Sequence, residues 1–130
     1  MRALIVEDDA ASRMVLKKFL EAYGETDVAE DGEQAISAFL ASQESGKLYD
    51  VICLDIMMPE KDGQTVLKEV RALETVWGVP AEKAAKVIMT TALNDKENLL
   101  KAVHQCDAYL VKPINRSDLL FYLRKFKLVA

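Results

Sequence analysis

The sequence predicts one α/β domain over residues 1–130, a doubly wound sheet of five parallel strands in the order 2-1-3-4-5 with helices on both faces. Short apolar runs alternate with segments of helical periodicity about five times along the chain. Runs such as Val51–Leu54 show no alternation of polar residues, which is typical of strands covered on both faces. The helical segments are also long enough for the right-handed crossovers that join parallel strands.

Each element is predicted from its own pattern. The expected strands are Ala3–Val6, Thr26–Ala29, Val51–Leu54, Lys86–Thr90 and Ala108–Val111. Helices are expected over about 10–23 before a stop at Gly24, after the caps Asp31, Asn94 and Asn115, and after Gly63. A polar loop is expected over Ser42–Lys47, and a short helical turn is expected to begin at Pro80. The wholly apolar first strand should lie inside the sheet, and the weak second strand should lie at an edge.

The charge, the hydropathy and the cysteine spacing of the chain indicate which classes of protein it does not resemble. A net charge of -4 argues against nucleic-acid binding, and no apolar run approaches the roughly 20 residues that span a bilayer. Cys53 and Cys106 have neither CxxC nor metal-ligand spacing, so reduced thiols and a cytoplasmic location are expected. The first strand begins almost at Met1 and the chain ends just after the last helix, which favours a stand-alone domain over a part of a longer regulator.

Carboxylates follow two of the predicted strands. Glu7 and Asp8 come directly after the first strand, and Asp55 ends the third. The carboxyl ends of parallel strands meet at one edge, where ligands of such sheets bind. Clustered carboxylates repel unless a cation neutralises them, and oxygen-only ligands suit Mg²⁺. The alternative is a surface cluster of acids that binds no ion.

Two further strand ends reach the same edge. The fourth strand ends at Thr90-Thr91-Ala92 and the fifth at Lys112-Pro113. Asp55 could attack phosphorus to give an aspartyl phosphate. Lys112 and Mg²⁺ would neutralise charge on the transferred group, and the Thr91 hydroxyl would bind one of its oxygens. These residues together predict a phosphoryl-transfer site, although each alone has an ordinary structural explanation.

With these residues in place, the whole chain resembles the receiver domain of two-component response regulators, which has a flavodoxin-like three-layer α/β/α fold. The segments that carry the resemblance are Val6-Glu7-Asp8-Asp9, Asp55-Ile56-Met57-Met58-Pro59-Glu60-Lys61-Asp62-Gly63, Thr91-Ala92 and Tyr109-Leu110-Val111-Lys112-Pro113. The resemblance implies that Asp55 is the phosphoacceptor and that Asp8, Asp55 and the Met57 carbonyl bind Mg²⁺, with Glu7 acting mostly through water. It also implies that Thr91 and Lys112 bind the phosphoryl group, that Tyr109 is a switch aromatic, and that the Lys112-Pro113 bond is cis.

The resemblance also implies the partners. A sensor histidine kinase or a phosphotransfer protein would donate the phosphoryl group to a monomer or a weak, phosphorylation-dependent dimer. A downstream protein would bind the face built from helix four, strand five and helix five, where Arg116, Phe121, Tyr122 and Lys125 are candidate contacts. The domain would be a signalling receiver that catalyses its own phosphorylation and dephosphorylation. No direct contact with nucleic acid or membrane is expected.

The sequence leaves three alternatives to a phosphorylated receiver. A phosphatase of the haloacid dehalogenase type needs a second aspartate at the position of Met57, and a flavodoxin-like carrier needs a phosphate loop in place of the acidic segment at Glu7. A receiver that serves only as a docking module is disfavoured by the complete set of site residues. Two segments depart from the family pattern, namely the long connection Glu74–Ala85, whose Trp77 is expected to anchor it on the body, and Gln105-Cys106.

Overall fold

A computed structural model describes residues 1–92, residue 100 and residues 106–130 of the chain. Its strands form one parallel sheet in the order β2-β1-β3-β4-β5, which confirms the predicted topology, with β1 inside the sheet and β2 at an edge. The strands are β1 (Arg2–Val6), β2 (Glu25–Ala29), β3 (Val51–Asp55), β4 (Lys86–Thr91) and β5 (Ala108–Val111).

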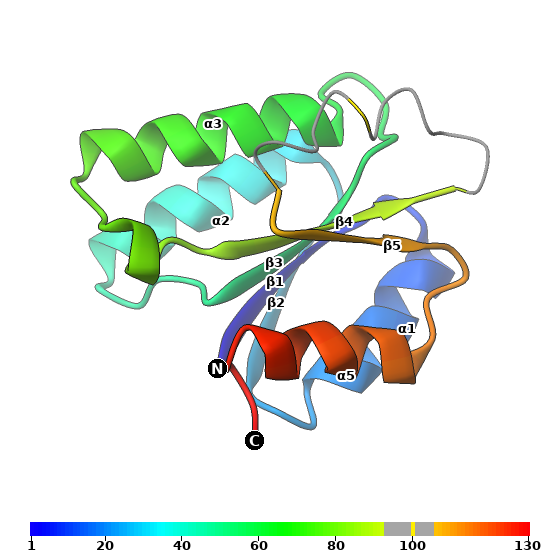
Figure 1. Cartoon of the computed structure of the whole chain (residues 1–130). Helices are drawn as coiled ribbons and strands as arrows, with labels where there is room; N and C mark the ends of the chain where they lie inside the picture. The colour runs from blue at the N-terminus through cyan, green and yellow to red at the C-terminus, as the bar shows by residue number, and fades with distance from the viewer. Residues whose placement is uncertain (93–99, 101–105) are drawn as a thin grey trace.

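Helices cover both faces of the sheet (Figure 1). Helices α1 (Ala10–Leu20) and α5 (Arg116–Lys125) lie on one face, and α2 (Gly32–Glu44) and α3 (Gly63–Val76) lie on the other. Apart from residue 100, the helix predicted after Asn94 falls outside the described residues, as does Gln105. Among the described helices, none combines the length and apolarity needed to cross a bilayer.

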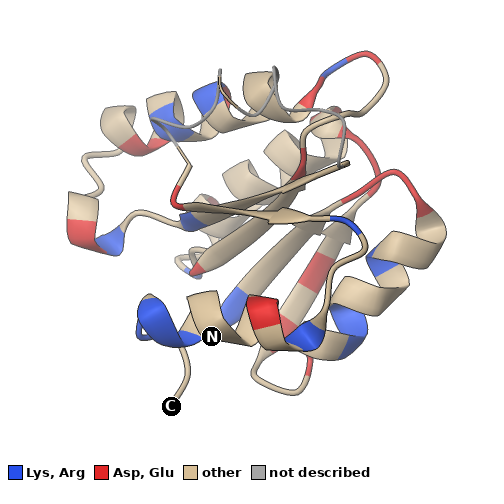
Figure 2. Cartoon of the chain, turned by 45° about the vertical axis from the view of Figure 1, so that its right-hand side comes forward, with Lys and Arg blue, Asp and Glu red and all other residues tan. Residues whose placement is uncertain are grey.

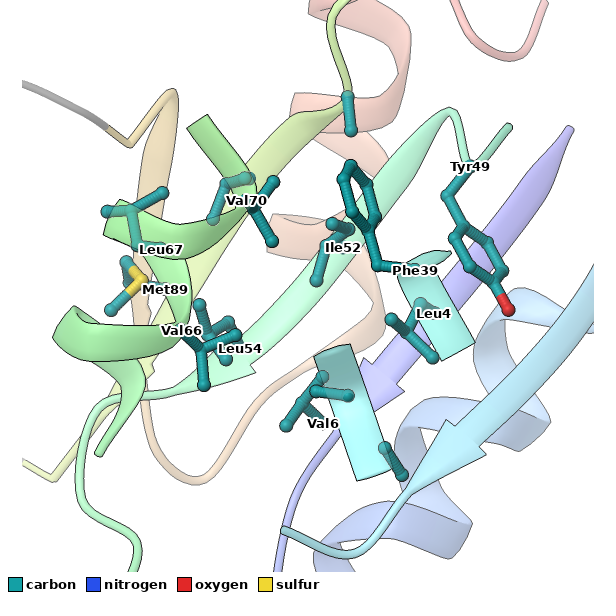
Figure 3. Packing of buried hydrophobic residues seen from close by; sticks show 14 of the residues in the cluster. Leu4, Val6, Phe39, Tyr49, Ile52, Leu54, Val66, Leu67, Val70 and Met89 are labelled. Carbon is teal, nitrogen blue, oxygen red and sulfur yellow. The ribbon is translucent and has the colours of Figure 1, made fainter. Parts of the chain in front are cut away.

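The sheet separates two hydrophobic cores. On the α2/α3 face, alternate strand residues such as Leu4, Ile52 and Met89 pack against the buried faces of both helices (Figure 3). On the α1/α5 face, the intervening residues pack against α1 and α5; they include Ile5, Cys53, Ile88 and Leu110. Successive side chains of a strand point to opposite faces of the sheet. A residue two positions after one of these core residues, just beyond the end of its strand, is therefore expected on the same face as that core residue.

The helix starts follow the predicted capping chemistry. The side chains of Asp31 and Asn115 accept hydrogen bonds from backbone N–H groups three residues on, as expected. Asp9 and Asp62 cap α1 and α3 in the same way, two caps that are not among those predicted above. The caps place the N-termini of α1 and α3 directly behind the acidic segments that follow β1 and β3.

Two predicted boundaries were wrong. Helix α1 ends at Leu20 rather than near residue 23, and Gly24 is not its stop signal: a side chain at Gly24 would overlap the backbone of Met1, so this glycine permits close packing of two chain segments. The loop predicted from Ser42 begins only after Glu44, because Ser42 is buried in α2 and its hydroxyl donates to the Phe39 carbonyl at 2.6 Å.

The long connection between α3 and β4 is folded against the body. The predicted turn is a short 3-10 helix, Ala81–Lys83, with Pro80 just before it rather than at its first position. Trp77 stacks on Phe39 with ring centroids 5.3 Å apart, which confirms it as the anchor of this segment. The buried carboxylate of Glu74 also accepts the N–H of Ala85 at 2.8 Å, so the connection closes on itself.

Candidate functional site

Three carboxylates meet at the carboxyl edge of the sheet. Glu7 follows β1 and is buried, Asp8 is exposed, and Asp55 is the buried last residue of β3. One oxygen of each lies within 4.8 Å of an oxygen of the others. Figure 2 shows acidic segments gathered on the loops at this edge, with a basic segment at the end of β5.

The strand period explains why these groups share one face. Glu7 lies two residues beyond Ile5 and Asp55 two residues beyond Cys53, both of which point into the α1/α5 core. Lys112 likewise lies two residues beyond Leu110. On this face of the sheet, the apolar core residues of three strands are therefore followed, two positions later along the chain, by Glu7, Asp55 and Lys112.

Lys112 joins the two buried acids. Its Nζ lies 2.9 Å from Glu7 Oε2 and 3.3 Å from Asp55 Oδ2. Burial acts to lower the pKa of Lys112, but its contacts with Glu7 and Asp55 outweigh that effect and hold the pKa above its ordinary value. The ammonium is therefore protonated at neutral pH. The Lys112-Pro113 peptide bond is cis, which confirms the prediction.

Asp55 is held under electrostatic strain. Its Oδ1 accepts the N–H of Met57 at 3.2 Å, and its Oδ2 faces Lys112. Burial, followed by repulsion from Glu7, raises the pKa of Asp55 to about 7 in spite of the lysine. A further positive charge at this edge would relieve the repulsion and favour the ionised, nucleophilic form.

The donor set fits a hard divalent cation. Among the described residues, Lys112 is the one cationic side chain that contacts these carboxylates, so three acids face one ammonium. Glu7 Oε2 is buried and faces that ammonium without a hydrogen bond of regular geometry. Oxygen ligands with an exposed member, Asp8, suit Mg²⁺, which keeps several waters. The residues present thus fit the predicted ion.

The structure places the other predicted residues beside this edge. Thr91 is buried at the end of β4, and its hydroxyl donates to the Ala92 carbonyl at 3.1 Å rather than toward Asp55. The side chain of Met57 is 57% exposed, so its backbone is the part that faces Asp55. Tyr109 is 45% exposed on β5, beside an open hollow of about 400 Å³ that it lines with Phe121 and Tyr122.

Two cations that support the site were missed by the sequence reading. Arg13 on α1 donates to the Glu7 carbonyl at 2.9 Å and pairs with Glu30 at 3.2 Å, which ties the segment carrying the acids to its neighbours. Lys61, in the loop after β3, pairs with Glu69 and with a glutamate of α2, both at 3.0 Å. Arg13 could have been recognised from its position one helical turn after the cap of α1. No pattern in the sequence indicates the role of Lys61.

Glycines let the loop after β3 pack closely. A side chain at Gly63 would overlap the backbone of Asp55, so α3 can begin against the strand end only with glycine there. A Cβ at Gly32 would lie 2.7 Å from Lys61 Cγ, so the lysine stem rests on the start of α2. Gly63 is the first residue of α3, and its structural role is this close approach.

Comparison with known proteins agrees with this geometry. Residues 3–124 match the family model described as "Response regulator receiver domain". The chain is 35% identical to the transcriptional regulatory protein RprY of Bacteroides fragilis, over 93% of this chain and 47% of that protein. It is 31% identical to the chemotaxis protein CheY of Bacillus subtilis, over 95% of each. The chain spans less than half the length of several transcriptional regulators that it matches.

A solved structure supports the same relationship. The receiver domain of Ssk1 from Saccharomyces cerevisiae, solved with the histidine phosphotransfer protein Ypd1, superposes with a TM-score of 0.80 at 25% identity. The superposition covers 97% of this chain and 88% of that chain. The similarity therefore extends over the sheet, the helices and the edge that carries the three acids.

Proposed function

Because this chain belongs to the response regulator receiver domain family, we propose that it accepts a phosphoryl group on Asp55 in a Mg²⁺-dependent reaction and signals by changing a protein-binding surface. The observation that carries the proposal is the meeting of Glu7, Asp8 and Asp55, within 4.8 Å of one another, with the ammonium of Lys112. This is a nucleophile surrounded by the charges that phosphoryl transfer needs.

The proposed reaction is a single displacement at phosphorus. A carboxylate oxygen of Asp55 forms a bond to phosphorus while the bond from phosphorus to the imidazole nitrogen of a phosphohistidine breaks, and the electron pair stays on that nitrogen. With acetyl phosphate as donor, acetate leaves instead. Lys112 would turn from Asp55 Oδ2 to an oxygen of the arriving group. Attack by water on the same phosphorus would return the free carboxylate and inorganic phosphate.

Glu7, Asp8, Asp55 and the Met57 carbonyl would hold the Mg²⁺ ion, with Glu7 acting mostly through water. When bound, the ion supplies positive charge to the oxygens of the transferring group. Asp8 is exposed and has no hydrogen bond or ion pair within the part of the chain that the structure describes, so it is free to turn toward a cation. Glu7 already faces Lys112, which makes it the less direct contributor.

We expect the donor to be a histidine kinase or a phosphotransfer protein, by analogy with the Ypd1–Ssk1 complex. The output would begin at Thr91, whose hydroxyl would leave the Ala92 carbonyl for a phosphoryl oxygen. Tyr109 would then turn inward and alter the face that includes Phe121 and Tyr122. The part of this face predicted on helix four lies outside the described residues.

Intact-mass analysis after treatment with acetyl phosphate and Mg²⁺ tests the acceptor. We expect one phosphoryl adduct on the wild type and none on Asp55→Asn, while Asp27→Asn, the same change in the middle of the edge strand β2, keeps the adduct. An equal yield on Asp55→Asn would contradict the assignment. No adduct on any of the three proteins would instead favour the docking module that phosphorylation does not control.

The output step has its own test. Beryllofluoride with Mg²⁺ mimics an aspartyl phosphate, and NMR shifts of Tyr109 and Phe121 report the state of the output face. We expect Thr91→Ala to bind the mimic at Asp55 but to show much smaller shifts at these two residues. Matching shifts in wild type and variant would mean that Thr91 does not couple the site to this face.

A further inference from the structure

A second hydroxyl lies beside Asp55 and has no partner among the described residues. Thr90, in β4, is 1% exposed, and its Oγ1 is a fully buried oxygen to which no described residue offers a hydrogen bond. Most buried side-chain hydroxyls in folded proteins have a partner, because an unpaired one loses its bonds to water and gains nothing in return. Neither the assigned site nor the core packing accounts for this hydroxyl.

The sheet register places Thr90 next to the phosphoacceptor. Thr90 and Asp55 are directly paired between β4 and β3. Paired residues of neighbouring parallel strands point to the same face, and their backbones lie about 4.8 Å apart. The face is the α1/α5 face, since Ile88, two residues before Thr90, belongs to that core. The Thr90 side chain therefore shares a face with Asp55 and with Lys112.

The neighbouring Thr91 points the other way in this alternation. Its hydroxyl is already engaged by the Ala92 carbonyl at 3.1 Å. Of the two threonines that end β4, the one on the face of Asp55 is thus Thr90, and its hydroxyl is the one left without a bond. Valine would fill the same volume among apolar neighbours such as Leu110 without burying an oxygen, so the packing alone gives no reason for a hydroxyl.

We propose that Thr90 is a positioning residue for phosphoryl transfer, whose hydroxyl donates a hydrogen bond to the side chain of Asp55 once Lys112 has turned to the arriving phosphoryl group. The inference rests on the proposed function of Asp55. In the resting protein Lys112 lies 3.3 Å from Asp55 Oδ2. When Lys112 leaves that oxygen, a neutral donor in the next strand can replace it and keep the carboxyl group oriented for in-line attack. The covalent steps of the proposed reaction are unchanged; only this hydrogen bond is added.

Thr90→Val removes the hydroxyl and keeps the shape, Thr90→Ser keeps the hydroxyl, and Thr26→Val makes the same change in β2, where Thr26 pairs with Ala3. With acetyl phosphate and Mg²⁺, we expect Thr90→Val to form the adduct about tenfold more slowly, the size of one hydrogen bond to a charged group. Thr90→Ser should stay within about twofold of wild type, since one retained hydroxyl donor preserves that bond. Thr26→Val should not change the rate.

Thermal unfolding separates positioning from packing. In chelator, Thr90→Val should have a Tm equal to or above that of wild type, because an unpaired buried hydroxyl has been removed. On addition of Mg²⁺ and beryllofluoride, wild type and Thr90→Ser should gain more in Tm than Thr90→Val, since only they have a hydroxyl to donate. A purely structural threonine would leave this gain the same in all variants.

The outcomes distinguish the inference from its premise. If the wild type forms no adduct, the proposed function of Asp55 fails. If the wild type forms the adduct and Thr90→Val matches it in rate and in the gain in Tm, Thr90 has no role and the inference is overturned. If Thr90→Val is slow and Thr90→Ser is equally slow, the hydroxyl is not the cause, and the inference is overturned as well.

Discussion

Two groups of acids lie at opposite ends of the same sheet, and each surrounds a cation. The site cluster consists of Glu7, Asp8, Asp55 and Lys112 at the carboxyl ends of the strands. The Arg71 cluster consists of Arg71, Glu74 and Asp107 at the amino ends of β4 and β5. Each contains at least one buried carboxylate, yet their hydrogen-bond partners differ, and this difference distinguishes the proposed chemical site from a structural cluster.

The Arg71 cluster satisfies its acids with backbone donors. Glu74 accepts from Arg71 and from the N–H of Ala85, both at 2.8 Å, and Asp107 accepts from Arg71 at 3.0 Å and from the N–H of Val87 at 2.8 Å. The bond from Ala85 closes the 74–85 connection, and the bond from Val87 ties the start of β4 to the residue before β5. Two acids thus accept hydrogen bonds from one guanidinium and two backbone N–H groups.

The site cluster is compensated less well. Glu7 and Asp55 share one ammonium, and each accepts one backbone N–H at 3.2 Å. Asp8 has no partner among the described residues, and the pKa of Asp55 is raised by burial and by Glu7. Folding alone gains little from such an arrangement. The unbalanced negative charge would instead provide binding energy for the proposed cation, which the Arg71 cluster has no reason to bind.

The largest expected contrast between the clusters concerns Mg²⁺. Excess chelator should abolish formation of the Asp55 adduct, and Asp8→Ala should slow it at least about 100-fold, because a direct metal ligand is lost. Glu7→Ala should be less damaging, since in the proposed site Glu7 would act mostly through water and already faces Lys112. The rate is measured by intact mass over a Mg²⁺ titration, and undiminished phosphorylation in chelator would refute the metal requirement.

Asp107→Ala is the matched control from the Arg71 cluster. It removes an acid that accepts the N–H of Val87, so it should lower the free energy of unfolding while leaving the Mg²⁺ dependence of phosphorylation as in wild type. Asp8→Ala should do the reverse, because Asp8 is exposed and its removal orphans no group. A loss of Mg²⁺ response in Asp107→Ala would show that the two clusters are not independent.

The two regions also differ in how far the sequence predicts them. The site could be placed because strand ends converge by topology: Glu7, Asp55 and Lys112 each follow an apolar strand, and the period of two assigns them to one face. Metal binding and the roles of the individual residues are still predictions. The closure of 74–85 was not predicted, because it depends on Glu74 meeting the backbone of Ala85, a contact with no periodic signal.

Two smaller misses have the same origin. Gly24 reads as a helix stop, and its actual reason, the approach of the Met1 backbone, is a tertiary contact. Lys61 reads as an ordinary loop lysine, and its pairing with Glu69 and its packing on Gly32 appear only in three dimensions. Local patterns predict elements and strand ends; contacts between segments that are distant in sequence require the folded chain.

The second contrast is in stability. Glu74→Gln should lower the free energy of unfolding by about 1–3 kcal/mol, because a carboxamide cannot accept from both Arg71 and Ala85 and leaves a buried donor unpaired. Glu82→Gln, an exposed change in the same segment, should have almost no effect. Urea unfolding measures both. Equal stability of the two variants would mean that Glu74 does not hold the connection closed, and neither variant should alter phosphorylation.

The smallest expected effect is a gain in stability at the site. The pKa of Asp55 is raised from 3.8 to about 7 by folding, so the folded state resists ionisation of this group. Below about pH 4, Asp55 is protonated in both states and costs nothing. As the pH rises toward 7, the unfolded state alone loses the proton, and the folded state becomes progressively less stable relative to it.

Asp55→Asn removes this cost, so in chelator its Tm should exceed that of wild type by an amount that grows from about pH 4 to about pH 7 and then stays constant. The full pKa difference corresponds to at most about 4 kcal/mol, and solvent screening at the open edge reduces the expected gain to about 1–2 kcal/mol. Mg²⁺ should narrow the gap by stabilising the wild type alone. The same change in the Arg71 cluster, Asp107→Asn, should give no such gain at any pH, since its carboxylate is paired with a guanidinium and a backbone N–H. A pH-independent difference between Asp55→Asn and wild type would show that Asp55 is not strained by its neighbours, and the contrast between the two clusters would then lie in metal binding alone.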